Sequence, residues 1–240
     1  MLRLTAMISG VALGLLFSGA ALGQPAIPAN AMTERVLGSP DAEITIVEYA
    51  SLTCPHCAAF HVETLPRIKS EFIETGIVRF VYRDFPLDQL AFFASILARC
   101  GPEDQYFDLL NTLFTRQEEW ALAEDPIAAL IAIGEGAGIP QENFEACTAD
   151  ETLTGYVLKM RSDAEQAGLV ESTPTFVVGD ILVSGALPFD EFTEVIDQAL
   201  DRASGIFDDD QKSGGIPPWA YGVGFILLAG AFLLFRRRRT

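Results

Sequence analysis

The sequence predicts an α/β fold in which a mixed β-sheet carries helices on both faces and is interrupted by an inserted all-helical block. Three observations support this prediction. A strand–helix–strand pattern runs over residues 43–83, apolar residues recur at helical spacing over 88–168, and a hairpin and a last helix follow over 175–203. Such a unit followed by a hairpin and a helix builds a mixed sheet between helical layers.

The strand–helix–strand unit begins with residues 43–49, a β-branched and apolar run of the length of a buried strand. An apolar-periodic helix follows. We expect Pro66 to kink this helix, because proline lacks an N–H group, and Gly76 to end it. Residues 77–83 are predicted to form the second strand.

The block at 88–168 contains chain-breaking residues that divide it into four or five predicted helices. These are Gly101, Pro102, Asp125, Pro126, Gly138, Pro140 and Gly168. Residues 175–178 and 181–183 are predicted strands joined by Gly179-Asp180, a hairpin signal. Residues 189–203 are predicted to form an amphipathic helix. The segment 24–42 shows too little periodicity to assign.

The N-terminal residues 1–23 have the pattern of a secretory signal peptide. Arg3 precedes an apolar stretch over 4–22. This stretch ends in small residues at the positions that a signal peptidase recognises. We expect cleavage before Gln24. An uncleaved N-terminal anchor is the alternative.

The C-terminal residues 218–235 are predicted to form a transmembrane helix, after a linker at 204–217 and before a cytoplasmic basic tail at 236–240. The uncharged part of this helix would be about 26 Å long, at the short end for a membrane span. Trp219 and Tyr221 suit one membrane interface, and the arginine cluster suits the cytoplasmic side. A buried helix and a processed sorting tail are the alternatives. Together, the two ends predict a periplasmic body tethered to a bacterial inner membrane.

Composition limits the partners of this body. The 240 residues carry a net charge of −17, which argues against nucleic acid, because a phosphate backbone needs basic neutralisation. Only four residues are Cys, so the chain is not a disulfide-dense scaffold, and its stability must come mainly from burial.

The strongest chemical signal is the tetrad Cys54-Pro55-His56-Cys57, which joins the first strand to the following helix. A sulfur at a helix N-terminus is stabilised as an anion by the helix dipole and by unpaired N–H groups. His56 can add a hydrogen bond or a positive charge. We therefore expect Cys54 to be the exposed attacking sulfur and Cys57, one turn further, to be the buried resolving sulfur.

The tetrad has two other interpretations. A metal site could use Cys54 and Cys57 with His56 or His61, but no second ligand pair is visible in the sequence. An inert structural disulfide is the other interpretation, although a strand-to-helix turn is a poor place to shield one. We predict neither a metal nor an organic cofactor, because the two cysteines themselves are the redox centre.

Over residues 43–203 the chain resembles the DsbA-type thiol:disulfide oxidoreductases, which have a thioredoxin fold with a helical insertion. The tetrad CPHC is the active-site sequence of the oxidant members of that family. The family carries a buried acid at the position of Glu48. The resemblance implies that Glu48 takes or relays the proton of Cys57. An ordinary strand-edge carboxylate is the alternative.

The resemblance also assigns a role to Thr173 and Pro174, which precede the predicted hairpin. In thioredoxin folds a cis-proline opens the strand that faces the two cysteines. A cis bond at Pro174 would hold the backbone of Thr173 beside Cys54, where an extended substrate chain can pair. A trans-proline that merely starts a strand is the alternative.

The remaining cysteines, Cys100 and Cys147, lie at predicted helix ends. In an oxidising compartment two free thiols would be a liability, so we predict a structural disulfide between them. Two separately buried thiols are the alternative. His61 is expected to be a surface or packing residue.

The sequence thus predicts a membrane-tethered enzyme that donates the Cys54–Cys57 disulfide to exported cysteine-containing proteins. The resemblance implies re-oxidation by a quinone-linked membrane oxidase of the DsbB type. The alternative function is a periplasmic reductase or isomerase that uses the same site. A non-enzymatic binding module and a structural adhesin explain the tetrad less well.

Overall fold

The computed structural model describes residues 27–205. The predicted signal peptide, transmembrane helix and basic tail lie outside the described residues, as does all but the first part of the predicted linker. Within residues 27–205, no helix is long and apolar enough to cross a membrane.

The sheet of the described chain has five strands in the order β1-β3-β2-β4-β5. They are β1 (Arg35–Leu37), β2 (Ile44–Ala50), β3 (Val78–Asp84), β4 (Thr175–Val178) and β5 (Ile181–Ser184). Strands β2 and β3 are parallel, and all other neighbours are antiparallel. The predicted mixed sheet is confirmed. Strand β1 was not predicted, because three residues are too few to show an alternating pattern.

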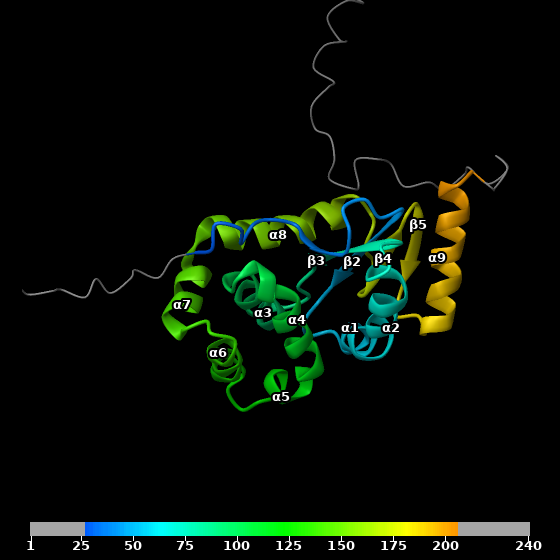
Figure 1. Cartoon of the computed structure of the whole chain (residues 1–240). Coiled ribbons are helices and arrows are strands. Elements are labelled where there is room, and N and C mark those ends of the chain that lie inside the picture. The colour runs from blue at the N-terminus through cyan, green and yellow to red at the C-terminus, as the bar shows by residue number, and fades with distance from the viewer. Residues whose placement is uncertain (1–26, 206–240) are drawn as a thin grey trace, which may run out of the picture.

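The side chains of β2 alternate between two hydrophobic clusters, one on each face of the sheet. Ile44 and Ile46 belong to the larger cluster, which includes residues of α9 (Phe189–Ala203) and of the helix that follows Cys54. Val47 and Tyr49 belong to the smaller cluster, which Ala164 of the insertion completes. The larger cluster also contains many residues of the insertion, such as Leu97 and Leu113. In Figure 1 α9 lies beside β5, away from most of the insertion helices.

The helix after Cys54 is not a regular α-helix. It consists of α1 (Pro55–Ala59), the π-helical segment η1 (Phe60–Thr64), α2 (Leu65–Ile68) and the π-helical segment η2 (Lys69–Ile73). Pro66 lies in the first turn of α2, directly after the wider π turns. Proline lacks an N–H and interrupts the helical hydrogen-bond ladder, and the wider π turns lie at this interruption. Gly76 follows the helix with φ at +82°, as expected for a glycine stop.

The insertion contains six α-helices, not the four or five that the chain-breaking residues predict. They are α3 (Gln89–Cys100), α4 (Tyr106–Thr115), α5 (Gln117–Ala121), α6 (Pro126–Gly136), α7 (Gln141–Ala149) and α8 (Glu151–Gln166), with a 3₁₀ turn, η3 (Glu103–Gln105). The break between α4 and α5 falls at Arg116, and that between α7 and α8 at Asp150. Neither break contains Gly or Pro. Asp150 starts α8 by accepting a hydrogen bond from the Leu153 N–H.

A buried ion pair joins the insertion to the sheet and to the N-terminal segment. Arg99 of α3 donates to Asp84 at the end of β3 over 2.6 Å, and both side chains are fully buried. The same guanidinium donates to the backbone carbonyls of Ala31 and Thr33. A buried charge pair adds little net stability, but removing one partner leaves an uncompensated charge. The pair therefore holds these three segments in one arrangement.

A disulfide bond links two helices of the insertion, α3 and α7. The structure joins Cys100 at the end of α3 to Cys147 in α7, with their Cα atoms 6.1 Å apart. Both residues are nearly inaccessible to solvent. The bond restricts the unfolded chain over a sequence separation of 47 residues.

Removing this disulfide should destabilise the fold without disabling the tetrad. We expect the double variant Cys100→Ala/Cys147→Ala to lose about 2–4 kcal/mol of unfolding free energy, because its unfolded chain regains the entropy of an open loop. Urea unfolding with Cys54 and Cys57 kept reduced measures this loss. A variant as stable as the parent would show that packing alone holds α3 against α7.

Candidate active site

The tetrad lies where β2 passes into helix α1. Cys54 is the N-cap residue of α1, with extended backbone angles (φ −84°, ψ 119°), and Pro55 is the first helical residue. Proline suits that position, because its fixed φ is helical and the N–H that it lacks would be unpaired. Cys57 lies one turn further and points into the core, where none of its surface is exposed.

Cys54 is less exposed than the sequence analysis expects. Only 6% of its surface is accessible, because the chain before β4 lies against it. The Cys54 Sγ donates to the carbonyl oxygen of Thr173 over 3.3 Å. Cys54 is nevertheless the more accessible sulfur of the pair, and the two cysteines are not bonded to each other in the structure.

The two thiols have pKa values shifted in opposite directions. The pKa of Cys54 is lowered from 9.0 to about 5, chiefly by a hydrogen bond from the Cys57 side chain and also by the backbone N–H groups of Cys57 and His56. The pKa of Cys57 is raised, first by burial, then by its hydrogen bond to Cys54 and by the nearby Glu48. At neutral pH the site therefore holds one thiolate and one thiol.

His56 contributes differently from the expectation. Its side chain is exposed, and its contribution to the lowered pKa of Cys54 comes from its backbone N–H. The start of the helix thus stabilises the thiolate through main-chain donors, which any residue at this position except proline could supply.

The peptide bond between Thr173 and Pro174 is cis. It directly precedes β4 and places the Thr173 carbonyl beside the Cys54 sulfur. The Thr173 side chain also helps to lower the pKa of Cys54 through a hydrogen bond. The backbone that leads into β4 therefore lies next to the reactive sulfur.

Glu48 is fully buried in β2, paired in register with Tyr82 of β3 and Phe176 of β4. Its Oε2 lies 2.8 Å from the Nε2 of His61. A surface position for His61 was one of two expectations, and it is wrong, because only 3% of this residue is exposed. Its ring stacks on Phe114 of the insertion with centroids 4.0 Å apart.

Two contacts from the insertion fix the active-site loop, and neither was predicted. Gln117 of α5 donates its Nε2 to the carbonyls of Leu52 and Cys54, at 2.8 and 3.0 Å. The Thr53 hydroxyl donates to Asp88 over 2.7 Å, and Asp88 in turn caps α3. No pattern in the sequence marks Gln117, because its role depends on which insertion helix packs beside the loop.

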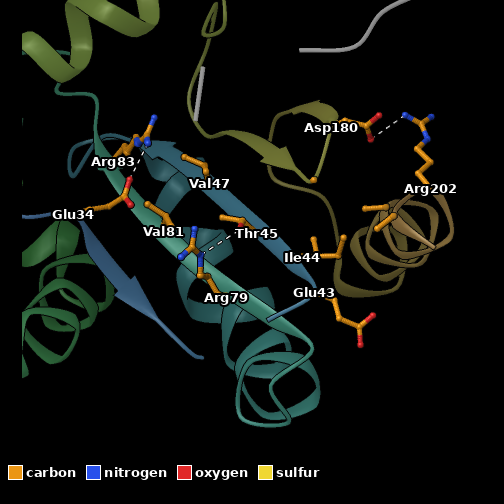
Figure 2. Close-up of a pocket in the computed structure, with 13 residues that line it drawn as sticks. Glu34, Glu43, Ile44, Thr45, Val47, Arg79, Val81, Arg83, Asp180 and Arg202 are labelled. Atoms are coloured by element: carbon orange, nitrogen blue, oxygen red, sulfur yellow. Dashed lines mark hydrogen bonds and ion pairs between the residues drawn. The ribbon is translucent and has the colours of Figure 1, made fainter. Parts of the chain in front are cut away.

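Two hollows of the described surface lie away from the tetrad. Figure 2 shows a pocket of about 410 Å³ on the sheet, lined by Thr45 and Val47 of β2, Arg79 and Val81 of β3 and the end of α9. No cysteine lines it. Among residues 27–205, no group of three or more His, Cys, Asp or Glu side chains is arranged to hold a metal ion.

The geometry suits thiol–disulfide exchange. One sulfur is ionised and is the more accessible of the two, the other is neutral and buried one turn away, and the Thr173 carbonyl lies beside the first. A thiolate with a low pKa attacks disulfides at neutral pH and also leaves readily when it is displaced.

Comparisons with known proteins agree with this chemistry. A family model described as thioredoxin matches residues 30–198. A Rickettsia prowazekii protein, provisionally named a protein-disulfide oxidoreductase, is 30% identical over 70% of this chain and 62% of its own length. The disulfide bond formation protein D of Bacillus subtilis is 29% identical over 74% of this chain and 80% of its own length. The crystal structure of Wolbachia pipientis α-DsbA1 matches with a TM-score of 0.67 and 28% identity, covering 73% of this chain and 95% of that one.

The fold and the site define a thioredoxin-fold protein with a redox-active cysteine pair and a helical insertion. The chain belongs to the thioredoxin family, and its relatives place it with the DsbA-type thiol:disulfide oxidoreductases. It spans less than two thirds of the length of the Rickettsia relative.

Proposed function

We propose that this protein donates the Cys54–Cys57 disulfide to exported cysteine-containing proteins. The lowered pKa of Cys54, about 5, is the observation that carries the proposal. A thiolate that is stable at pH 7 stabilises the reduced enzyme relative to the disulfide form. The disulfide form is then a strong oxidant, which favours a donor over a reductase.

The proposed reaction proceeds in two exchanges. A substrate thiolate attacks Cys54 Sγ, a bond forms between these sulfurs, and the Cys54–Cys57 bond breaks. Cys57 leaves as a thiolate and takes up a proton, because burial raises its pKa. A second substrate thiolate then attacks the substrate sulfur of the mixed disulfide, and Cys54 leaves as a thiolate. The substrate has lost two electrons, which the two enzyme sulfurs have gained.

The neighbouring residues support these exchanges. Pro55 starts the helix whose N–H groups face Cys54. The Thr173–Pro174 segment places backbone beside Cys54, where an extended substrate strand could pair. Glu48 is buried and raises the pKa of Cys57, so we assign it the exchange of the Cys57 proton.

The two ends of the sequence support a periplasmic site of action. The apolar stretch at 4–22 has the features of a secretory signal, and the uncharged run before Arg236 has those of a membrane anchor. We propose that the anchor keeps the enzyme in the same membrane as a DsbB-like oxidase that restores its disulfide. If a form that lacks residues 206–240 is re-oxidised in cells as fast as the full chain, the anchor has no such role.

A dithiol peptide tests the donor function. The full chain in its disulfide form should oxidise the peptide stoichiometrically at pH 7, because the Cys54 thiolate drives the exchange forward. Cys54→Ser should abolish the reaction, and Cys57→Ser should abolish turnover while its Cys54 still forms mixed disulfides with an activated disulfide. Cys100→Ala/Cys147→Ala, in which the tetrad is intact, is the matched control. An equilibrium that leaves the peptide reduced and the enzyme oxidised would contradict the proposal.

A further inference from the structure

A buried carboxylate–imidazole pair lies beneath the tetrad, held from three elements. Glu48 comes from β2, His61 from η1, and Phe114 of α4 covers the imidazole face. Glu48 and His61 expose 0% and 3% of their surfaces. The distance between Oε2 and Nε2 is 2.8 Å, and the two stacked rings are inclined by 22°. The imidazole therefore has one well-defined position against the carboxylate.

Among residues 27–205, the groups found against this pair carry no compensating positive charge. From β3, the ring of Tyr82 lies 5.9 Å from the His61 ring, and burial raises the pKa of Tyr82 well above its ordinary value, so it stays neutral. From α1, Cys57 is kept neutral by burial and by its neighbours Cys54 and Glu48. The other rings against His61 are apolar. They are Phe60, Phe80 and Phe114.

In this buried environment, the net charge of the Glu48–His61 pair depends on how many protons it holds. A buried carboxylate beside a neutral imidazole carries one uncompensated negative charge, which is costly in the protein interior. One added proton makes the pair neutral, whether it is a carboxylic acid with an imidazole or a carboxylate with an imidazolium. The Glu48 Oε1 has no hydrogen-bond partner among the described residues, so the carboxylate has one oxygen free for a proton.

We propose that Glu48 and His61 together hold one proton, which moves to Cys57 Sγ when Cys57 leaves the disulfide, and that the pair then takes up another proton from solvent. During re-oxidation the pair first releases this proton to solvent and then accepts the proton of Cys57, as Cys57 attacks the mixed disulfide at Cys54 and releases the other thiolate. His61 acts through Glu48 and is therefore a positioning residue. This inference rests on the proposed exchange at Cys54 and deepens it, because it gives the Cys57 proton a defined donor and acceptor.

Ring closure in the reduced enzyme isolates this step. When the full chain reacts with glutathione disulfide, Cys54 first forms a mixed disulfide with glutathione, and Cys57 then displaces glutathione. Acid quenching and mass spectrometry follow both steps between pH 4 and pH 9. The first step depends on the Cys54 thiolate and serves as an internal control, whereas the second needs an acceptor for the Cys57 proton.

His61→Gln keeps a hydrogen-bond donor for Glu48 but removes the group that shares its proton. We expect this variant to slow ring closure at pH 7 by at least about tenfold, as for a lost general base, and to leave the first step within twofold. Glu48→Gln should have a similar effect, and the double variant should be no slower than the slower single variant, because the two residues act as one unit. Phe114→Leu, which removes only the stacking ring, should keep the wild-type pH profile.

Several outcomes would overturn the proposal. One is a His61→Gln variant with the wild-type rate and pH profile of ring closure, and another is a double variant whose effect is the product of the two single effects. If His61→Gln does not fold, an NMR titration of the wild-type chain tests the proposal instead. It contains two histidines, so the ring ¹⁵N signals of His61 can be assigned, and they should change over the same pH interval as the ring-closure rate. Signals that stay constant over that interval would overturn the proposal.

The same data separate this inference from the proposed function. The equilibrium that wild-type enzyme reaches with glutathione reports whether the Cys54–Cys57 disulfide is oxidising. A weakly oxidising equilibrium would contradict the donor function, whereas the ring-closure comparison between wild type and His61→Gln would still test the role of the pair.

Discussion

The difference in environment between two sulfurs of one helical turn is the constraint on which the site depends. Cys54 lies at the first position of α1, where backbone N–H groups have no helical partners. Cys57 lies inside the core, where a charge is costly. The hydrogen bond from Cys57 to Cys54 adds to this difference, because it stabilises the Cys54 thiolate and the Cys57 thiol together. One sulfur is thus ready to react while the other holds its proton.

The rest of the fold keeps the two sulfurs in these environments. Strand β2 ends immediately before the tetrad and carries Glu48 beneath it, and the cis-proline segment covers Cys54 from the side of β4. The insertion does more than enlarge the domain. Gln117 holds the backbone of the active-site loop, and Phe114 holds the imidazole that binds Glu48. The helical block therefore has contacts with the site both at the surface and beneath the tetrad.

The sequence predicts those parts of the structure that depend on local patterns. Strands β2 and β3, the β4–β5 hairpin and α9 follow from periodicity and turn residues, and all are present. Strand β1 is too short to show a pattern, and the breaks at Arg116 and Asp150 lack the usual residues. The contacts of His61 and Gln117 depend on how the insertion packs against the sheet. Neither residue type nor spacing reveals such a contact, so the sequence does not show that His61 pairs with Glu48.

The dependence of the Cys54–Cys57 reduction potential on pH tests the central claim most directly. With one sulfur ionised and the other protonated, reduction takes up one proton for two electrons, and the potential falls by about 30 mV per pH unit. Below the pKa of Cys54, about 5, two protons are taken up and the slope doubles to about 60 mV. The account predicts a potential well above that of glutathione, with this change of slope near pH 5. A slope of about 60 mV that continues to pH 8 would show that Cys54 is an ordinary thiol, and it would contradict the account.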